Sequence, residues 1–240
     1  MTRRPDALAA WVAEYPRQDA IHRHGFRLNI GKWNALVGLL PGAPLVSEDG
    51  GKDVGLISRR SLFQLAAAAR RDDSGTAALG LFWHALAWGT GSNHRNTPGR
   101  IKSVAADTTR SGQLLRDAAC LAVSDSKAAF LLLKPSHTAL KHWGPNFFTK
   151  FLYFAGAGKV DHPSVIVDAR VLATLHAETN DKRFKPPSAS YPVSTYMAAC
   201  ELMQDWASEL STPERTVGAD EVERWAFSEG RGWRARASNL

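Results

Sequence analysis

Asp168 is the residue whose place in the sequence points most directly to chemistry. It follows the aliphatic run 165–167 and precedes an apolar helical pattern, so it should leave a buried segment and begin a helix. At a helix start, backbone N–H groups and the helix dipole keep a carboxylate ionised. An ionised carboxylate held at the wall of a cleft can stabilise a cation. Asp168 is therefore interpreted either as a helix cap or as a catalytic carboxylate, and both roles can hold at once.

A turn upstream of Asp168 has the composition of a phosphate-binding site. In the run HWGPN, Gly144 permits a sharp turn, and Pro145 can occupy an early helical position without losing a hydrogen-bond donor. Amide groups exposed at such a helix start, including that of Asn146, attract anions. Lys141 and His142 would add positive charge, so these residues are candidates for contacts with DNA. The alternative is an ordinary connection between two helices.

Helical patterns dominate the remaining chain and should form the framework around these residues. Apolar residues recur at helical spacing, whereas strand patterns are scarce. The expected helices cover 58–70, 76–88, 112–123, 126–134, 147–156, 168–178, 188–210 and 219–227. Connections rich in Gly, Pro and Asn separate them. The sequence predicts an all-α fold, a two-lobed helical bundle with a cleft between the lobes.

Local patterns also predict where several of these helices begin and end. Ser58 and Ser194 are expected as N-caps, and Gly156 can end its helix. Pro192 interrupts the stretch 188–210, so the helix there should begin near Val193 or Ser194.

The composition favours a globular protein with a polyanionic partner. Of the 240 residues, 44% are hydrophobic and 22% are charged, which is ordinary, but the formal net charge is +7. A positive surplus favours nucleic acid, because each phosphate that it neutralises releases counterions. Two cysteines, Cys120 and Cys200, are too few for a zinc site or a disulfide framework, and the histidines lack metal-ligand spacing. No apolar run has membrane-spanning length, so we expect a cytoplasmic protein without cofactors or membrane partners.

Residues 140–171 resemble the helix-hairpin-helix and catalytic-aspartate signature of the helix-hairpin-helix DNA glycosylase superfamily, nearest its 8-oxoguanine glycosylase branch. The run GPNFFTKFLYFAG corresponds to the hairpin and the following helix, and VDARV corresponds to the catalytic segment. The resemblance implies that Asp168 is the catalytic carboxylate. Members that also cleave the DNA backbone carry a nucleophilic lysine about eighteen residues before the aspartate. Lys150 occupies that position, since 168 − 150 = 18.

The sequence departs from the family hairpin at one position. The family usually has two glycines one residue apart, whereas here Asn146 follows Gly144 at that spacing. Alignment on Asp168 places Lys150 in the lysine position, and alignment on the hairpin places Phe148 there. Lys150 is therefore expected to be the nucleophile, and the alternative is a solvated lysine on an amphipathic helix.

A second segment, residues 81–101, is similar to a helix and Asn-rich turn of the same branch. In that branch the turn fills the gap left by an extruded base. The similarity implies this role for Asn93, His94 and Arg95, and a phosphate contact for Arg100. The alternative is a loop that faces solvent.

The resemblance implies a DNA repair glycosylase that flips a damaged or modified base, such as an oxidised purine, out of double-stranded DNA and cleaves its N-glycosidic bond. Lyase activity would follow if Lys150 faces the cleft. The enzyme is expected to be a monomer, with one glycosylase-like domain over 1–240 and a flexible basic tail at 231–240. Candidates for stacking on the extruded base are Trp143, Trp225 and Phe227.

Two other functions remain open from the sequence. One is a non-catalytic helix-hairpin-helix module that binds DNA through the hairpin, with Asp168 acting only as a helix cap. The other is a glycosylase directed at modified bases of foreign DNA. The sequence does not rank the substrates, because the base pocket is assembled from segments that are distant in the chain.

Overall fold

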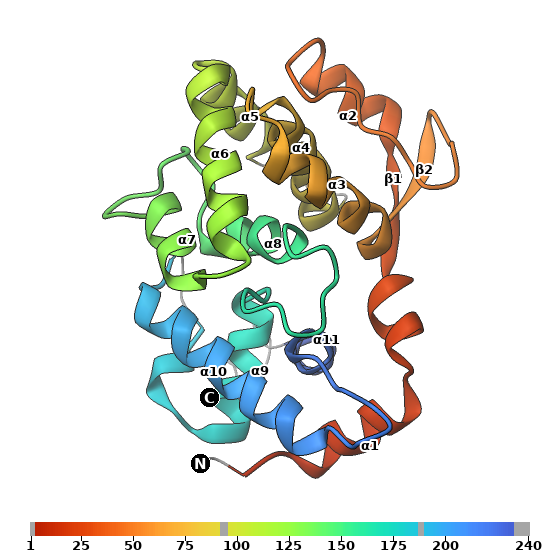
Figure 1. The fold of residues 1–240 in the computed structure, drawn as a ribbon, viewed down its shortest axis with the longest axis vertical. Coiled ribbons are helices and arrows are strands. Elements are labelled where there is room, and N and C mark those ends of the chain that lie inside the picture. Colours follow the sequence, from red (N-terminus) through yellow and green to blue (C-terminus); the bar gives the residue numbers. More distant parts are fainter. Residues whose placement is uncertain (1–2, 92–95, 187–189, 233–240) are drawn as a thin grey trace.

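The computed structural model describes residues 3–91, 96–186 and 190–232, which form helices around one small sheet (Figure 1). The first half contains α1 (Asp6–Glu14), the π-helical turn η1 (Gln18–His22), β1 (Gly25–Asn29), α2 (Ile30–Val37), β2 (Val54–Ser58), α3 (Arg59–Arg71), α4 (Thr76–Thr90), α5 (Thr97–Ala105) and α6 (Thr108–Ala122). The second half contains α7 (Ser126–Leu133), α8 (Pro145–Phe154), α9 (Ala169–Thr179), the 3-10 turn η2 (Lys182–Phe184), α10 (Val193–Leu210) and α11 (Ala219–Glu229). The expected all-α class is confirmed.

The caps explain why several helices begin where the sequence predicts. The Ser58 hydroxyl accepts a hydrogen bond from the backbone N–H of Ser61, and the Ser61 hydroxyl accepts one from the backbone N–H of Ser58. Helix α3 therefore begins with a capping box. Helix α10 begins at Val193 as expected. The prediction of Ser194 as its cap is wrong, because the extended residue before the helix is Pro192. Helix α8 ends before Gly156, with Ala155 as its C-cap.

The elements that the sequence did not predict are short. Helices α1, α2 and α5 contain nine, eight and nine residues. Such short helices hold few turns of an apolar repeat, although α7, also of eight residues, was expected from its sequence. Strands β1 and β2 contain five residues each and pair antiparallel, with Phe26 opposite Ile57. Ile57 on β2 is fully buried. The small sheet adds an edge to the helical fold and brings Phe26 close to the end of α4.

Helix α4 lies at the centre of the first group of helices, where it packs against α3, α6 and α8. It is apolar on every side, as expected of a helix that is enclosed by others. In Figure 1, α2 to α6 form the upper part of the molecule, and α1, α9, α10 and α11 form the lower part, with α8 between them. One hydrophobic core extends through both groups of helices, and α7 packs against both α8 and α10.

A buried network of charged and polar side chains ties α3, α8 and α11 together. Arg59 on α3 forms a 2.7 Å ion pair with Glu223 on α11 and donates a 3.0 Å hydrogen bond to the Tyr153 hydroxyl on α8. Tyr153 donates in turn to Asp220, at 2.9 Å, and Asp220 is paired with Arg17. Burial raises the pKa of Glu223, and the adjacent Arg59 guanidinium opposes that shift. The network fixes the relative positions of the helices that surround the site described below.

The structure bears only in part on the expectations about membrane helices, the tail, the domain organisation and the location. No described helix is long and apolar enough to cross a membrane. Of the proposed tail 231–240, only Arg231 and Gly232 belong to the described residues. The single domain over 1–240, the monomeric state and the cytoplasmic location stay predictions.

Removal of Arg59 should destabilise the fold strongly. Arg59→Leu leaves Glu223 charged and buried without its partner, and we expect a loss of about 3–5 kcal/mol in the free energy of unfolding. Urea unfolding followed by circular dichroism measures it. The double variant Arg59→Leu/Glu223→Leu should regain part of this loss. As a control, Arg23→Leu removes an exposed pair with Asp19 and should cost at most about 1 kcal/mol. Equal losses at Arg59 and Arg23 would contradict the role of the network.

Candidate active site

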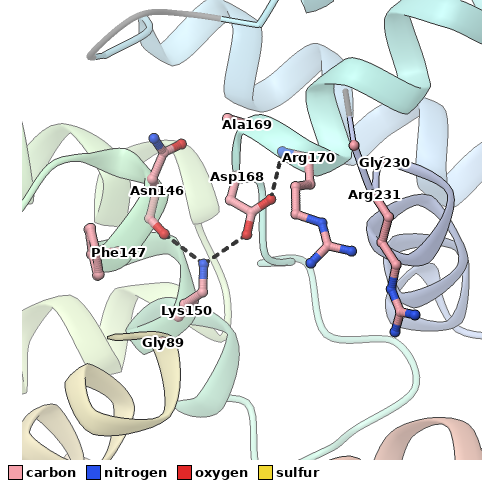
Figure 2. A pocket seen from close by; sticks show the side chains of 10 residues that line it. Gly89, Asn146, Phe147, Lys150, Asp168, Ala169, Arg170, Gly230 and Arg231 are labelled. Atoms are coloured by element: carbon pink, nitrogen blue, oxygen red, sulfur yellow. Dashed lines mark hydrogen bonds and ion pairs between the residues drawn. The ribbon is translucent and has the colours of Figure 1, made fainter. Parts of the chain in front are cut away.

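Lys150 and Asp168 meet in a contact between α8 and the start of α9. The Nζ atom of Lys150 lies 3.0 Å from Oδ2 of Asp168 and donates a second hydrogen bond, of 2.7 Å, to the backbone carbonyl of Asn146 (Figure 2). The side chains of Lys150 and Asp168 are only 8% and 13% exposed. Lys150 is therefore not a solvated lysine, and it forms a largely buried ion pair with Asp168.

The two carboxylate oxygens of Asp168 have different partners. Oδ1 accepts hydrogen bonds from the backbone N–H groups of Arg170, at 3.0 Å, and Val171, at 3.3 Å, so Asp168 is the N-cap of α9. Oδ2 faces Lys150 instead. The cap fixes the orientation of the carboxylate, and one oxygen is left for the lysine. Capping and a role in a site are compatible in this geometry.

Gly89 on α4 leaves room for the lysine side chain. A Cβ atom at this position would lie 2.8 Å from Cδ of Lys150 and 3.3 Å from Cε. Contacts of 2.8 Å are shorter than carbon atoms tolerate. Any larger residue at 89 would therefore displace the Lys150 chain from its present course.

Two pockets open on the Lys150–Asp168 pair. The larger has a volume of about 560 Å³ and lies between α8, the start of α9 and the end of α11. Arg170 and Arg231 line it together with the pair (Figure 2). The smaller, of about 160 Å³, lies between the end of α4, strand β1 and α11. We call the larger one the outer pocket and the smaller one the aromatic pocket.

The aromatic pocket combines ring faces with polar atoms that lack partners. Phe26, Trp88 and Phe227 line it, and the rings of Phe26 and Trp88 lie 5.4 Å apart. The indole Nε1 of Trp88 and the hydroxyl of Thr90 are buried and have no hydrogen-bond partner among the described residues. Buried polar atoms normally have partners, so these two atoms are exceptions among the described residues.

A comparison with protein families identifies the chain. Residues 19–227 match the family described as "Putative 8-oxoguanine DNA glycosylase OGG-like protein". The chain belongs to this family. No curated protein and no solved structure matches it. The family membership confirms the resemblance seen in the sequence and supports a DNA glycosylase at the level of the family.

In this OGG-like protein the hairpin turn differs from the expected one. Gly144 has an extended backbone, with φ −76° and ψ 178°, and precedes α8 as its N-cap. His142 carries the positive φ, 62°, that the turn requires. The expectation that Gly144 makes the sharp turn is therefore wrong. The helix before the turn is α7, which ends at Leu133, so residues 134–144 form a longer connection than a tight hairpin.

Helix α5 holds this turn in place. Arg100 is buried, donates a 2.8 Å hydrogen bond to the carbonyl of His142, and lies over the Phe147 ring at 3.8 Å from its centroid. Ser103 accepts a 2.8 Å hydrogen bond from the backbone N–H of Lys141, whose side chain is exposed. The guanidinium of Arg100 therefore supports the backbone of the turn from a buried position, and its expected contact with a phosphate stays a prediction.

The structure describes only some of the remaining residues that the sequence proposed for the site. Asn93, His94 and Arg95 lie outside the described residues. Asn146 lines the outer pocket, with its carbonyl bound to Lys150. Lys141 and the hairpin amides keep their proposed contacts with DNA as predictions.

Of the aromatic candidates for base stacking, only Phe227 lines one of the two pockets. Trp143 and Trp225 are buried in the hydrophobic core and line neither pocket. Trp88 and Phe26 line the aromatic pocket and were not among the candidates. Trp88 follows a helical apolar pattern that is typical of core residues. Its place at the end of a helix, directly before a Gly-rich turn, is the feature that could have revealed it.

The steric role of Gly89 can be tested through stability. In a helix, Gly→Ala normally stabilises by about 0.4–1 kcal/mol. Gly89→Ala should lose this gain, because the new methyl group displaces Lys150. In a Lys150→Ala background, where Cδ is absent, the same change should recover it. Urea unfolding of the four proteins measures the coupling. The same gain in both backgrounds would show that Gly89 does not constrain Lys150.

Proposed function

We propose that this protein is a DNA N-glycosylase that extrudes a damaged or modified base from double-stranded DNA and cleaves its glycosidic bond, with Asp168 and Lys150 as the catalytic pair. The observation that carries this proposal is the 3.0 Å contact between Lys150 Nζ and Asp168 Oδ2 at the boundary between two pockets. A nucleotide outside the duplex has a base and a sugar-phosphate part. The two pockets offer a separate place for each.

The aromatic pocket is the proposed site of the extruded base. An extruded base requires stacking faces and hydrogen bonds to its edge. Phe26, Trp88 and Phe227 offer the faces. The indole N–H of Trp88 and the hydroxyl of Thr90, both without partners among the described residues, can donate to oxygen or nitrogen acceptors on the base. Placed there, the base brings its sugar to the Lys150–Asp168 pair.

Asp168 would act on the sugar. When the bond between C1′ and the base breaks, the electron pair leaves with the base and positive charge develops on the sugar. A carboxylate that is already held by the amides of Arg170 and Val171 stabilises this charge without reorganising. Its fixed orientation is therefore part of the proposed chemistry.

Lys150 would supply the nucleophile. Attack on C1′ requires the amine to lose a proton, which the departing base can take up on the electron pair of the broken bond. Asp168, whose Oδ2 lies 3.0 Å from Nζ, then keeps the charge that stabilises the sugar. The new Nζ–C1′ bond replaces the bond to the base, and opening of the sugar ring then gives a Schiff base. Elimination from that intermediate removes a proton from C2′, which the released base or water can accept, and breaks the bond between C3′ and its oxygen, so that the strand is cut. Lyase activity is thus part of the proposal.

The substrate is best identified by base release from a panel of duplexes. The panel contains oxidised purines, alkylated bases, deaminated bases and the hypermodified bases found in foreign DNA. We expect release of an oxidised purine. Release of only a hypermodified base would assign the protein to foreign DNA, and release of none would contradict a glycosylase.

Asp168→Asn should abolish base release and retain binding to the duplex. Asparagine caps a helix about as well as aspartate, so α9 should be preserved while the negative charge is lost. We expect the rate to fall by about 10³-fold or more in single-turnover assays. Asp125→Asn is the matched control, because Asp125 caps α7 in the same way and lies outside both pockets. Full activity of Asp168→Asn would refute the assignment.

Lys150→Gln separates the lysine mechanism from attack by water. Borohydride reduces a Schiff base to a stable bond, so wild-type protein should become covalently attached to its substrate DNA and Lys150→Gln should not. Gel electrophoresis of the trapped complex measures this. Lys127→Gln, the same change on the surface of α7, should trap like wild type. Base release by wild-type protein without any trapped adduct would favour a water nucleophile.

A further inference from the structure

Three aromatic rings meet at the aromatic pocket, and one of them does not line it. The centroid of the His24 ring lies 5.2 Å from that of Phe26 and 5.4 Å from that of Trp88, and both contacts are edge-to-face. Phe26 and Trp88 lie 5.4 Å apart and line the pocket, whereas His24 is not among the residues that line it. His24 therefore contacts two rings of the pocket without being part of its wall.

His24 is bound to Arg59 through both its backbone and its ring. The carbonyl oxygen of His24 accepts a 2.9 Å hydrogen bond from the backbone N–H of Arg59, and its Nδ1 accepts a 3.2 Å hydrogen bond from Nε of Arg59. Arg59 is fully buried and binds Tyr153 and Glu223 through its other two nitrogens. The His24 ring is therefore attached to the buried network that joins α3, α8 and α11.

The bond to Arg59 fixes the protonation and the orientation of the His24 ring. A guanidinium nitrogen donates and does not accept, so Nδ1 of His24 must be the acceptor, and the proton of the neutral ring must be on Nε2. The pKa of His24 is lowered to about 2, first by burial and then by nearby arginines, of which Arg59 has the largest effect. The ring is therefore neutral at physiological pH. A rotation of this ring by 180° would break its bond to Arg59.

Phe26 is the less enclosed of the two pocket rings that His24 contacts. It is 38% exposed and lies on β1, in a sheet of only two strands. Trp88 is 5% exposed and also contacts Phe154 and the Arg59 guanidinium. A ring that is free to move loses conformational entropy when a ligand orders it. Contacts that order Phe26 in the free protein therefore favour stacking.

We propose that His24 is a positioning residue, which holds the rings of Phe26 and Trp88 in the orientation that stacks on the extruded base. The inference rests on the proposed function, which places the base in the aromatic pocket. Edge-to-face contacts have a preferred geometry, so a ring that is fixed by Arg59 restricts the rings that pack against it. His24 thus strengthens the binding of the base without touching it.

Binding to two duplexes, one with the base and one without it, tests this role. The first duplex carries the base that the wild-type protein releases, and the second carries a tetrahydrofuran abasic analogue at the same position. All proteins carry Asp168→Asn, so that the base stays attached. His24→Asn should weaken binding to the first duplex about tenfold and leave binding to the second unchanged.

The variant and its control are chosen to separate the ring from the hydrogen bond. In His24→Asn the amide oxygen can replace Nδ1 as the acceptor from Arg59, while the ring is lost. The matched control is His22→Asn, because His22 packs edge-to-face on Phe63 and lines neither pocket. The control should bind both duplexes like its parent. Equal losses of His24→Asn on both duplexes would show a role in the fold alone and overturn the proposal, as would no loss on either.

Nuclear magnetic resonance tests the same contacts without DNA. In the wild-type protein, the ring nitrogens of His24 should show a neutral ring with its proton on Nε2, and a proton on Nδ1 would overturn the proposal. The indole N–H of Trp88, assigned through Trp88→Phe, should have an order parameter of about 0.85, as rigid backbone has. This value should fall in His24→Asn and not in His22→Asn, and an unchanged value in His24→Asn would contradict the positioning role.

Failure of the proposed function is a separate result. It appears as absent base release from every duplex of the panel, while the resonance measurements on His24 and Trp88 are unaffected. Conversely, base release that persists with an unchanged order parameter in His24→Asn would keep the glycosylase and remove His24 from it.

Discussion

The buried network around Arg59 is the constraint on which the site depends. Tyr153 lies three residues after Lys150 on α8, and Glu223 lies four residues before Phe227 on α11. Because Arg59 binds both Tyr153 and Glu223, it fixes the positions of α8, which carries Lys150, and α11, which carries Phe227, relative to α3. Each partner is one helical turn from a residue that lines a pocket. The position of Lys150 relative to Phe227, which both line the aromatic pocket, is therefore fixed by buried charged groups.

The sequence located Asp168 but not its surroundings, for a physical reason. A helix cap and the apolar run before it are local features, and so are the boundaries of long amphipathic helices such as α3 and α10. The aromatic pocket is assembled from β1, α4 and α11, which are far apart in the chain. A buried tryptophan at helical spacing gives the same sequence pattern whether it lines no pocket, as with Trp143, or lines one, as with Trp88. Only packing separates these cases.

The hairpin illustrates the same limit on a smaller scale. The sequence indicated a turn before α8, and the turn exists, but the positive φ falls on His142 and not on Gly144. A non-glycine residue tolerates this conformation where its surroundings hold it. Here Arg100, 42 residues upstream, binds the His142 carbonyl. The sequence therefore suggested a DNA contact for Arg100, because nothing in the segment around Arg100 shows that this residue is buried.

In the free protein, some polar groups at the pockets are paired and others lack partners, and this distribution suits the proposed reaction. Lys150 and Asp168 are already bound to one another, whereas Trp88 and Thr90 at the aromatic pocket and Arg170 at the outer pocket keep buried atoms without partners. New hydrogen bonds made on binding are therefore concentrated where a base and a phosphate would lie, and not at the reacting atoms. Extrusion of a base costs free energy that such contacts can offset. In the proposed reaction, binding energy remote from the bond that breaks can thus be used to bring the sugar to a pair, Lys150 and Asp168, that is assembled in advance.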